Sequence, residues 1–398
     1  MIIRKRTLLF ISLLTASALI SCKKDETETL PYLDGSVRVD FEPALPAYIR
    51  ANDNTVYTMV PHGASHPDGL EVGYRWKVSP GESSSYQESE EADGSFKYNF
   101  AEYNKDTLRT ITVTCEAFAD GYTPLSASYS VIVVNSGEKG SIQRAGYDFS
   151  GSYVELDGIR YLTYEAPDGN IWMQQNLAYD GEGDDAVTGA PYVEAEAMSD
   201  VFGRYYTWNE ATGNKSGNDG SPVQGICPDG WHIPSDEEWT ALANATMREK
   251  YPDWTDMPSD KDWSQDEAKI SREFMAGELL DPEIPDTDED YDSDINYGKE
   301  ARSATFNSEI LWEYFSNVGD PTNRSGISAI PAGYARYTDG FWNFSGAFEY
   351  AIFWTSTEDA TNGNKAVCRV INNESQVVYR DAHDKSTFAA SVRCVKNK

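Results

Sequence analysis

The stretch from Cys227 to Trp239, CPDGWHIPSDEEW, constrains the fold of this chain more than any other. A Pro-Asp-Gly sequence follows the cysteine and supplies turn chemistry. Ser235 and Glu238 then form a capping box, in which each side chain accepts a hydrogen bond from the backbone N–H of the other residue at a helix start. Apolar residues continue beyond Trp239 at helical spacing. The stretch therefore predicts a helix from Ser235 to about Lys250, with its two tryptophans anchoring the helix start in the core.

Five other short motifs accompany this stretch in a fixed order along the chain. They are DGNIWMQQNL at 168–177, GRYYTW at 203–208, SGISAIPAGY at 325–334, FWTSTE at 353–358 and SVRCV at 391–395. Together with residues 227–239 they resemble the major paralogous (FISUMP) domain of bacterial surface lipoproteins. The resemblance implies a fold related to C-type lectins and formylglycine-generating enzymes. It also implies a disulfide between Cys227 and Cys394, which lies in the last predicted strand.

Upstream of these motifs the chain has the pattern of a β-sandwich. Between Ser36 and Val134, short runs of alternating polar and apolar residues are broken by turn residues, and the strongest run is Leu108–Phe118. About six or seven such runs in a segment of this length are typical of an immunoglobulin-like (Ig) or PKD-like sandwich. Trp76 on a middle strand is then expected to pack near Cys115 on a late strand. The expected fold class is β-rich α+β, with an N-terminal Ig-like β-sandwich followed by a C-type-lectin-like α+β domain.

Changes in composition divide the chain into segments. The segment after the sandwich is rich in Gly, Ser and Lys, which is typical of a linker. Residues 252–300 carry 17 acidic and 4 basic side chains, so we expect an exposed acidic insertion, with a helical pattern over 267–280. We expect the first hairpin of the second domain, which turns at 167–170, to pair with the last strand. The expected division is 1–21 lipoprotein signal peptide, 22–31 tether, 32–135 Ig/PKD-like sandwich, 136–146 linker and 147–398 FISUMP domain.

The N-terminus has the pattern of an export signal. Basic residues in Met1–Arg6 precede the apolar run Leu8–Ile20, which is too short to span a bilayer. The sequence LISC that ends at Cys22 looks like a lipobox, in which cleavage leaves the cysteine to carry acyl chains. The charged residues 23–26 resemble signals that send some lipoproteins to the cell surface. We therefore expect a lipid-anchored protein on the outer membrane of a Gram-negative bacterium, and an ordinary soluble secretion signal is the alternative.

Net charge and cysteine content argue against several functions. The chain has a formal net charge of −32, so it repels nucleic acid and anionic membrane surfaces. Membrane contact is expected through the lipid anchor instead. Cys115 and Cys368 fall in different predicted domains and are expected to be buried free thiols. The four histidines are scattered and no CxxC motif occurs, which argues against a zinc site.

An aromatic segment between Tyr334 and Tyr350 is the strongest candidate for ligand binding. Aromatic rings beside Asn, Asp and Arg side chains suit sugar stacking or a protein-binding hot spot. In lectin-like folds this part of the chain forms ligand-facing loops. The alternative is that the rings fill a loop-rich core. The candidate ligand-binding residues are Arg336, Tyr337, Asp339, Trp342 and Asn343.

Two weaker patterns concern calcium. Alternating carboxylates at Asp286, Asp288, Asp290 and Asp292 can supply several of the about six to eight oxygens that Ca²⁺ needs. The run lacks the glycine and the glutamate of an EF-hand loop, so the site is a weak candidate, and a solvated acidic loop is the alternative. The sequence WNE at 208–210 is similar to a calcium and sugar motif of C-type lectins but lies in the wrong half of the domain. No cofactor other than this possible calcium is expected.

Catalytic signatures are missing from the sequence. It has no Gly-x-Ser-x-Gly elbow, Walker loop or metal-binding His pair. Formylglycine-generating enzymes use a reactive cysteine pair, but here the resemblance commits Cys394 to the disulfide, which leaves Cys368 alone. We therefore expect a binding protein rather than an enzyme. The expected function is adhesion or the capture of a glycan or protein at the cell surface, and the alternative is a structural or accessory subunit of a surface appendage or envelope complex.

Overall fold

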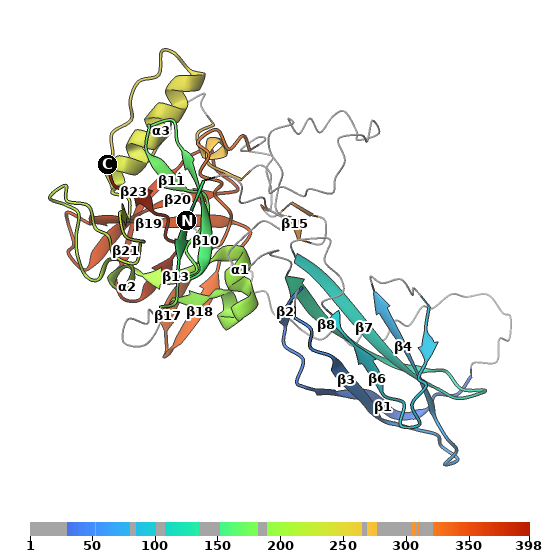
Figure 1. Cartoon of the computed structure of the whole chain (residues 1–398). Helices are drawn as coiled ribbons and strands as arrows, with labels where there is room; N and C mark the ends of the chain where they lie inside the picture. Colours follow the sequence, from blue (N-terminus) through green and yellow to red (C-terminus); the bar gives the residue numbers. More distant parts are fainter. Residues whose placement is uncertain are drawn as a thin grey trace.

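The computed structural model describes residues 30–51, 53–79, 85–100, 108–134, 152–181, 189–264, 269–276, 305–306, 309–310, 312 and 321–398. This part of the chain is β-rich, as the sequence predicts. Figure 1 shows an N-terminal part built of long strands beside a C-terminal part that carries the longest helix.

Two sheets form the N-terminal part. Their strands are β1 Asp34–Glu42, β2 Tyr48–Arg50, β3 Tyr57–Ser65, β4 Gly73–Ser79, β5 Gln87–Glu88, β6 Phe96–Tyr98, β7 Leu108–Phe118, β8 Leu125–Val134, β15 Thr305–Phe306 and β16 Glu309–Ile310. One sheet has the order β1-β3-β6, and the other has the order β16-β15-β7-β4-β5, with β8 also on β7 and β2 on β8. The strand β15 therefore adds a segment from far downstream in the chain to the edge of the upstream sheet.

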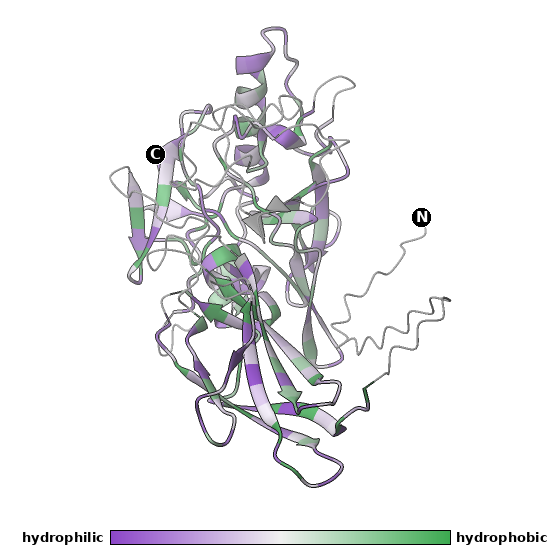
Figure 2. Cartoon of the chain, turned by 90° about the vertical axis from the view of Figure 1, so that its right-hand side faces the viewer, coloured by the Kyte–Doolittle hydropathy of each residue, from purple (hydrophilic) through white to green (hydrophobic). Residues whose placement is uncertain are grey.

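The alternating sequence pattern explains why the two sheets pack together. Hydrophilic and hydrophobic residues alternate along these strands (Figure 2), so each strand turns its apolar side chains to one face. The apolar faces meet in one core that includes Met59 of one sheet and Val113 of the other. Trp76 lies directly opposite Cys115 across β4 and β7, and both side chains are buried. The expected proximity of this pair is confirmed.

Three sheets and short helices form the C-terminal part. The elements up to the longest helix are β9 Tyr153–Leu156, β10 Ile159–Glu165, β11 Ile171–Met173, β12 Ala190–Pro191, η3 Tyr192–Glu194, η4 Glu196–Met198, α1 Ser199–Phe202, β13 Arg204–Thr207, α2 Trp208–Thr212, β14 Trp231–His232 and α3 Asp236–Lys250. The later elements are η5 Ser271–Glu273, β17 Tyr334–Thr338, β18 Phe341–Ser345, β19 Tyr350–Glu358, β20 Lys365–Asn372, β21 Tyr379–Asp384, β22 Phe388–Ala390 and β23 Val395–Lys396. The sheet orders are β14-β23-β11-β10-β9, β12-β13-β22-β17-β18 and β19-β20-β21.

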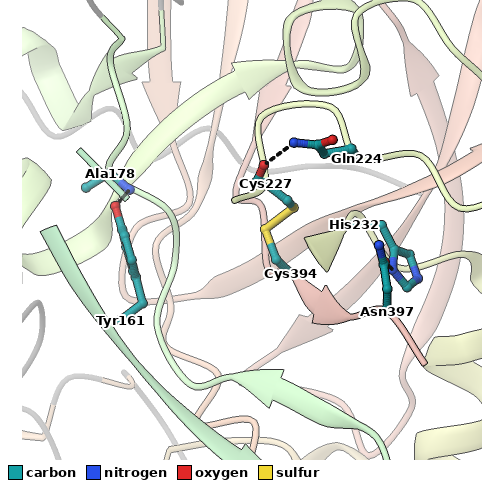
Figure 3. Close-up of a disulfide and its surroundings, with 7 residues drawn as sticks. All are labelled: Tyr161, Ala178, Gln224, Cys227, His232, Cys394 and Asn397. Carbon is teal, nitrogen blue, oxygen red and sulfur yellow. Dashed lines mark hydrogen bonds between the residues drawn. A yellow bond between two sulfur atoms is a disulfide. The ribbon is translucent and has the colours of Figure 1, made fainter. Parts of the chain in front are cut away.

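The two ends of the C-terminal part lie together. Strands β10 and β11 form the expected hairpin, and Gly169 takes the left-handed backbone conformation at its turn, with φ of 76°. Trp172 of β11 pairs with Val395 of β23, so the predicted contact between the first hairpin and the last strand is confirmed. The disulfide Cys227–Cys394 is also confirmed (Figure 3). It joins the segment before α3 to the end of the chain.

Helix α3 begins where the capping box predicts. The hydroxyl of Ser235 accepts a hydrogen bond from the backbone N–H of Glu238 at 3.2 Å, and the Glu238 carboxylate accepts one from the Ser235 N–H at 2.9 Å. The apolar face of the helix is buried in a core where Trp239 stacks on Phe353 at 5.2 Å between ring centroids. Beside the helix start, His232 contacts Asn397, with 2.6 Å between Nδ1 and Oδ1 (Figure 3).

The start of the acidic segment differs from the expected exposed loop. Met257 and Trp263 are buried in the same core as α3. The side-chain amide of Asn244 in α3 donates a hydrogen bond to the carbonyl of Met257 at 3.0 Å and accepts one from the Met257 N–H at 2.8 Å. Within residues 269–276 the structure has the three-residue 3-10 turn η5 instead of the expected helix. The N–H of Ala276 donates to the carbonyl of Ala329 at 2.8 Å, so strand-like pairing replaces the next helical turn.

The N-terminal and C-terminal parts contact each other through β2 and the segment that leads into α1. The Nε of Arg50 donates to Oδ2 of Asp200 at 2.6 Å, and its Nη2 donates to the carbonyl of Glu196 at 3.0 Å. Beside this ion pair, Val134 of the N-terminal part shares a buried cluster with Phe202. The predicted linker, 136–146, lies outside the described residues.

Candidate functional site

The five candidate ligand-binding residues lie on one β-hairpin. Strands β17 and β18 pair Arg336 with Asn343 and Tyr337 with Trp342. Asp339 and the glycine after it form the two-residue turn, and both take positive φ, at 56° and 88°. An Asp-Gly turn of this kind matches the twist of the two strands. The segment is a regular hairpin and not the expected set of ligand-facing loops, because the turn sets the register of the two strands.

Packing separates the aromatic side chains of this hairpin into two groups. Phe344 and Trp342 are partly buried and pack against a buried cluster beside the hairpin. By contrast, Tyr337 is 47% exposed and Phe341 is 73% exposed, while the rings of Tyr337 and Trp342 lie 5.4 Å apart. The core-filling alternative therefore describes Phe344 and Trp342, whereas Tyr337 and Phe341 present aromatic surface to solvent.

Polar and charged groups surround this aromatic surface. The exposed guanidinium of Arg336 lies over the rings of Tyr334 and Phe388, 5.3 and 5.5 Å from their centroids. Phe388 also stacks on His383, with 3.8 Å between centroids. The amide of Asn343 donates to the carbonyl of Phe341 at 3.3 Å. A cation over an aromatic ring is attracted to the face of that ring, so the hairpin offers a surface with both apolar and polar groups.

A polar hollow of about 460 Å³ lies next to the hairpin. It is formed by the start of α2, the turn between β19 and β20, and the turn between β21 and β22. The side chains that matter for its chemistry are Asn209, Asn214, Glu358, Asn364, Asp384 and Lys385.

The turn over residues 384–387 borders both the hollow and the hairpin. The Asp384 carboxylate accepts hydrogen bonds from the backbone N–H groups of Ser386 and Thr387, both at 2.9 Å. The hydrogen bond from Ser386 holds the pKa of Asp384 below its usual value, because it favours the ionised carboxylate. The carbonyl of Thr387 in turn accepts a hydrogen bond from the Tyr337 N–H at 2.9 Å. The hollow and the hairpin tip are therefore parts of one end of the domain.

An ion pair lies at the wall of the hollow. The ammonium of Lys385 pairs with the carboxylate of Glu358 and lies 4.5 Å from the ring centroid of Trp208. The indole N–H of Trp208 donates to the carbonyl of Thr355 at 2.9 Å. These contacts fix the lysine against the wall, and they cover the face of the indole ring. Stacking of a ligand on Trp208 is therefore not expected.

The other predicted site residues have different outcomes. Cys22 and the acidic run Asp286, Asp288, Asp290 and Asp292 lie outside the described residues. Within the described ranges, no group of three or more His, Cys, Asp or Glu side chains is arranged to hold a metal ion. Nor does any described helix combine the length and the apolar character needed to cross a membrane.

The two remaining cysteines are buried free thiols, as expected. Burial raises the pKa of Cys115 to about 12 and raises that of Cys368 well above its usual value. A thiol that stays protonated at neutral pH is a poor nucleophile. The surroundings of these two thiols thus give neither of them the thiolate that a catalytic cysteine needs.

The hollow is not evident in the sequence because its walls come from distant parts of the chain. The tripeptide at 208–210 is similar to a lectin motif but lies in the wrong half of the domain for that motif. The pairing of Thr207 with Ala389 between β13 and β22 places the start of α2 beside the turn after β21. A local signal did exist, since Asn and Asp crowd the segments 359–364 and 381–384, but sequence alone does not show that these turns meet.

Comparison with known proteins identifies the downstream part. A model of the family described as the Fibrobacter succinogenes major domain matches residues 168–396. The match begins at the first of the six short motifs and extends past the last, so the family predicted from those motifs is confirmed. No curated protein and no solved structure matches the chain.

Proposed function

Since the chain belongs to the Fibrobacter succinogenes major domain family, we propose that it is a lipid-anchored surface protein that captures a glycan or a protein. The observation that carries this proposal is the hairpin β17–β18. Its tip exposes Tyr337 and Phe341 beside Arg336, Asp339 and Asn343 on a regular two-stranded scaffold. Aromatic rings next to hydrogen-bonding groups are typical of surfaces that bind sugars or form protein hot spots.

The arrangement of the chain supports this proposal. We propose that the N-terminal part is an Ig-like sandwich, because two sheets pack over one core there, and that it acts as a spacer. We propose that the C-terminal part is lectin-like, because its first hairpin pairs with its last strand. The proposed anchor, Cys22, precedes the sandwich in the sequence. This order places the hairpin domain farther along the chain from the membrane than the spacer.

The anchor is tested by the Cys22→Ala variant. Because a lipobox cysteine carries the acyl chains, we expect the wild-type chain in the outer-membrane fraction and the variant in the soluble fraction. A lipoprotein with a known anchor serves as the fractionation control. Digestion of intact cells with protease should remove the wild-type protein if it is displayed outside. A Cys22→Ala variant that stays with the membrane would contradict lipid anchoring at this residue.

The binding surface is tested by the Trp342→Ala variant on a protein or an oligosaccharide that the wild-type chain captures. Truncation of a central aromatic residue in a binding surface costs about 2 kcal/mol or more, so we expect the Kd to rise at least about 30-fold. Since Trp342 also packs against a buried cluster, the Tyr337→Ala variant, at a more exposed residue, separates loss of contact from loss of structure.

Tyr32→Ala is the matched control for these variants, because Tyr32 is an exposed tyrosine in the N-terminal part. We expect its Kd to equal that of the wild-type chain. Unchanged affinity in both hairpin variants would contradict the assignment of the ligand surface to β17–β18.

A further inference from the structure

We propose that the polar hollow beside the hairpin is a second binding site, which takes one uncharged, polyhydroxylated group such as the pyranose ring of a neutral sugar. This inference deepens the proposed function, because it names a ligand class, but it rests on a separate set of residues. Three observations carry it: uncommitted amide side chains, a fixed backbone and the local charge.

Three asparagines, Asn209, Asn214 and Asn364, line the hollow, and their carboxamides have no hydrogen-bond partner within the part of the chain that the structure describes. Each carboxamide has two donor hydrogens and one acceptor oxygen, and each sugar hydroxyl both donates and accepts. Adjacent hydroxyls on a pyranose ring can therefore satisfy both ends of one carboxamide.

The backbone holds these three asparagines in a fixed relation. The Lys385 N–H donates to the carbonyl of Asn364, and the Lys385 carbonyl accepts from the Asn209 N–H, both at 3.1 Å. The N–H of Asn214 donates to the carbonyl of Asn209 at 3.2 Å. A continuous series of backbone hydrogen bonds thus joins all three residues across two turns and a short helix. A preformed arrangement lowers the entropy that ligand binding would otherwise cost.

The charges around the hollow favour a neutral ligand. Glu358 and Lys385 neutralise each other as an ion pair, and the ionised Asp384 leaves one net negative charge in the lining. An acidic sugar or a phosphate group would be repelled by that charge and would gain no free cation, since the ammonium of Lys385 is already paired. The volume of about 460 Å³ falls in the range usual for small-molecule sites, but the lining is more polar than the apolar lining usual there, which suits a group that carries several hydroxyls.

The test measures binding of methyl glycosides to the full chain by saturation-transfer NMR, which detects weak ligands. The probes are the methyl glycosides of glucose, galactose, mannose and N-acetylglucosamine, with the methyl glycoside of glucuronic acid as the charged counterpart. We expect saturable binding of at least one neutral glycoside and at least about tenfold weaker binding of the glucuronide. Asn209→Ala and Asn364→Ala should each weaken the neutral ligand about tenfold, the usual effect of losing a hydrogen-bonding group.

One control variant and one comparison separate this site from the hairpin. Asn54→Ala removes an exposed asparagine of the N-terminal part and should leave binding unchanged. Loss of glycoside binding in Trp342→Ala, with Asn209→Ala and Asn364→Ala unaffected, would place the sugar at the hairpin and overturn this inference while sparing the proposed function. Failure of every neutral glycoside to bind, equal binding of the glucuronide, or unchanged affinity in Asn364→Ala would each overturn it.

Discussion

Replacing Asp236 with asparagine is expected to lower the free energy of unfolding of the C-terminal part by about 3–5 kcal/mol, because a buried cation then loses its counter-charge. The carboxylate of Asp236 bonds the Nε atoms of Arg369 and Arg380, both at 2.7 Å. The side chain of Arg369 is only 1% exposed and also donates to the carbonyls of Ser259 and Lys261. The cluster therefore joins α3, β20, β21 and the start of the acidic segment.

Burial dominates the electrostatics of this cluster. Burial raises the pKa of Asp236 even though two arginines oppose the shift, and burial lowers the pKa of Arg369 to about 10 despite its bond to the carboxylate. Each charge is thus tolerated only because its partner is present. Removal of one partner therefore lowers the free energy of unfolding by more than the intact ion pair contributes to it, because the other charge stays buried without a partner.

Urea denaturation monitored by tryptophan fluorescence measures this effect. The matched control is Asp256→Asn, which breaks the exposed pair with Arg248 and should cost less than about 1 kcal/mol. The double variant Asp236→Asn with Arg369→Met should lose less stability than the sum of its two single variants, because the residues interact directly. Equal midpoints for Asp236→Asn and Asp256→Asn would contradict the account of the cluster.

Loss of the disulfide is expected to have the second large effect. Cys227 and Cys394 are 167 residues apart in the sequence, and a cross-link over a long loop restricts the unfolded chain strongly. We expect the double variant Cys227→Ser with Cys394→Ser to lose about 2–5 kcal/mol of stability. Reduction of the wild-type chain should lower its urea midpoint as far as the two serine substitutions lower it.

Reductant should leave the midpoint of the double serine variant unchanged, because Cys115 and Cys368 are free thiols. This comparison separates the disulfide from other effects of the reductant. If the wild-type midpoint does not move on reduction, the disulfide does not stabilise the folded chain and the expectation is wrong.

Local chemistry made part of this fold predictable from the sequence. The capping box of Ser235 and Glu238 involves residues three apart, so the start of α3 needs no tertiary information. The Pro-Asp-Gly-Asn turn likewise fixes the hairpin of β10 and β11. The disulfide followed from the family motifs and not from spacing, because four cysteines can pair in more than one way.

Long-range packing explains what the sequence did not predict. Trp263 falls in the segment that is expected to be an exposed acidic loop. Its backbone instead pairs with that of Val378, which holds this part of the segment against the core where the indole ring is buried. The hairpin of β17 and β18 could have been predicted, since Asp339-Gly340 between aromatic runs is a strong hairpin signal. The hollow could not, because Asn209 and Asn364 come together only through the pairing of distant strands.

A binding screen of the wild-type full chain is the measurement that tests the central claim most directly. The chain would be applied to an array of glycans and extracellular proteins, once with calcium and once with chelator. We predict saturable binding to a small group of related ligands, and binding seen only with calcium would assign a role to the acidic run. A blank array under both conditions, from a chain shown to be folded, would contradict the capture function and favour a structural subunit of an envelope complex.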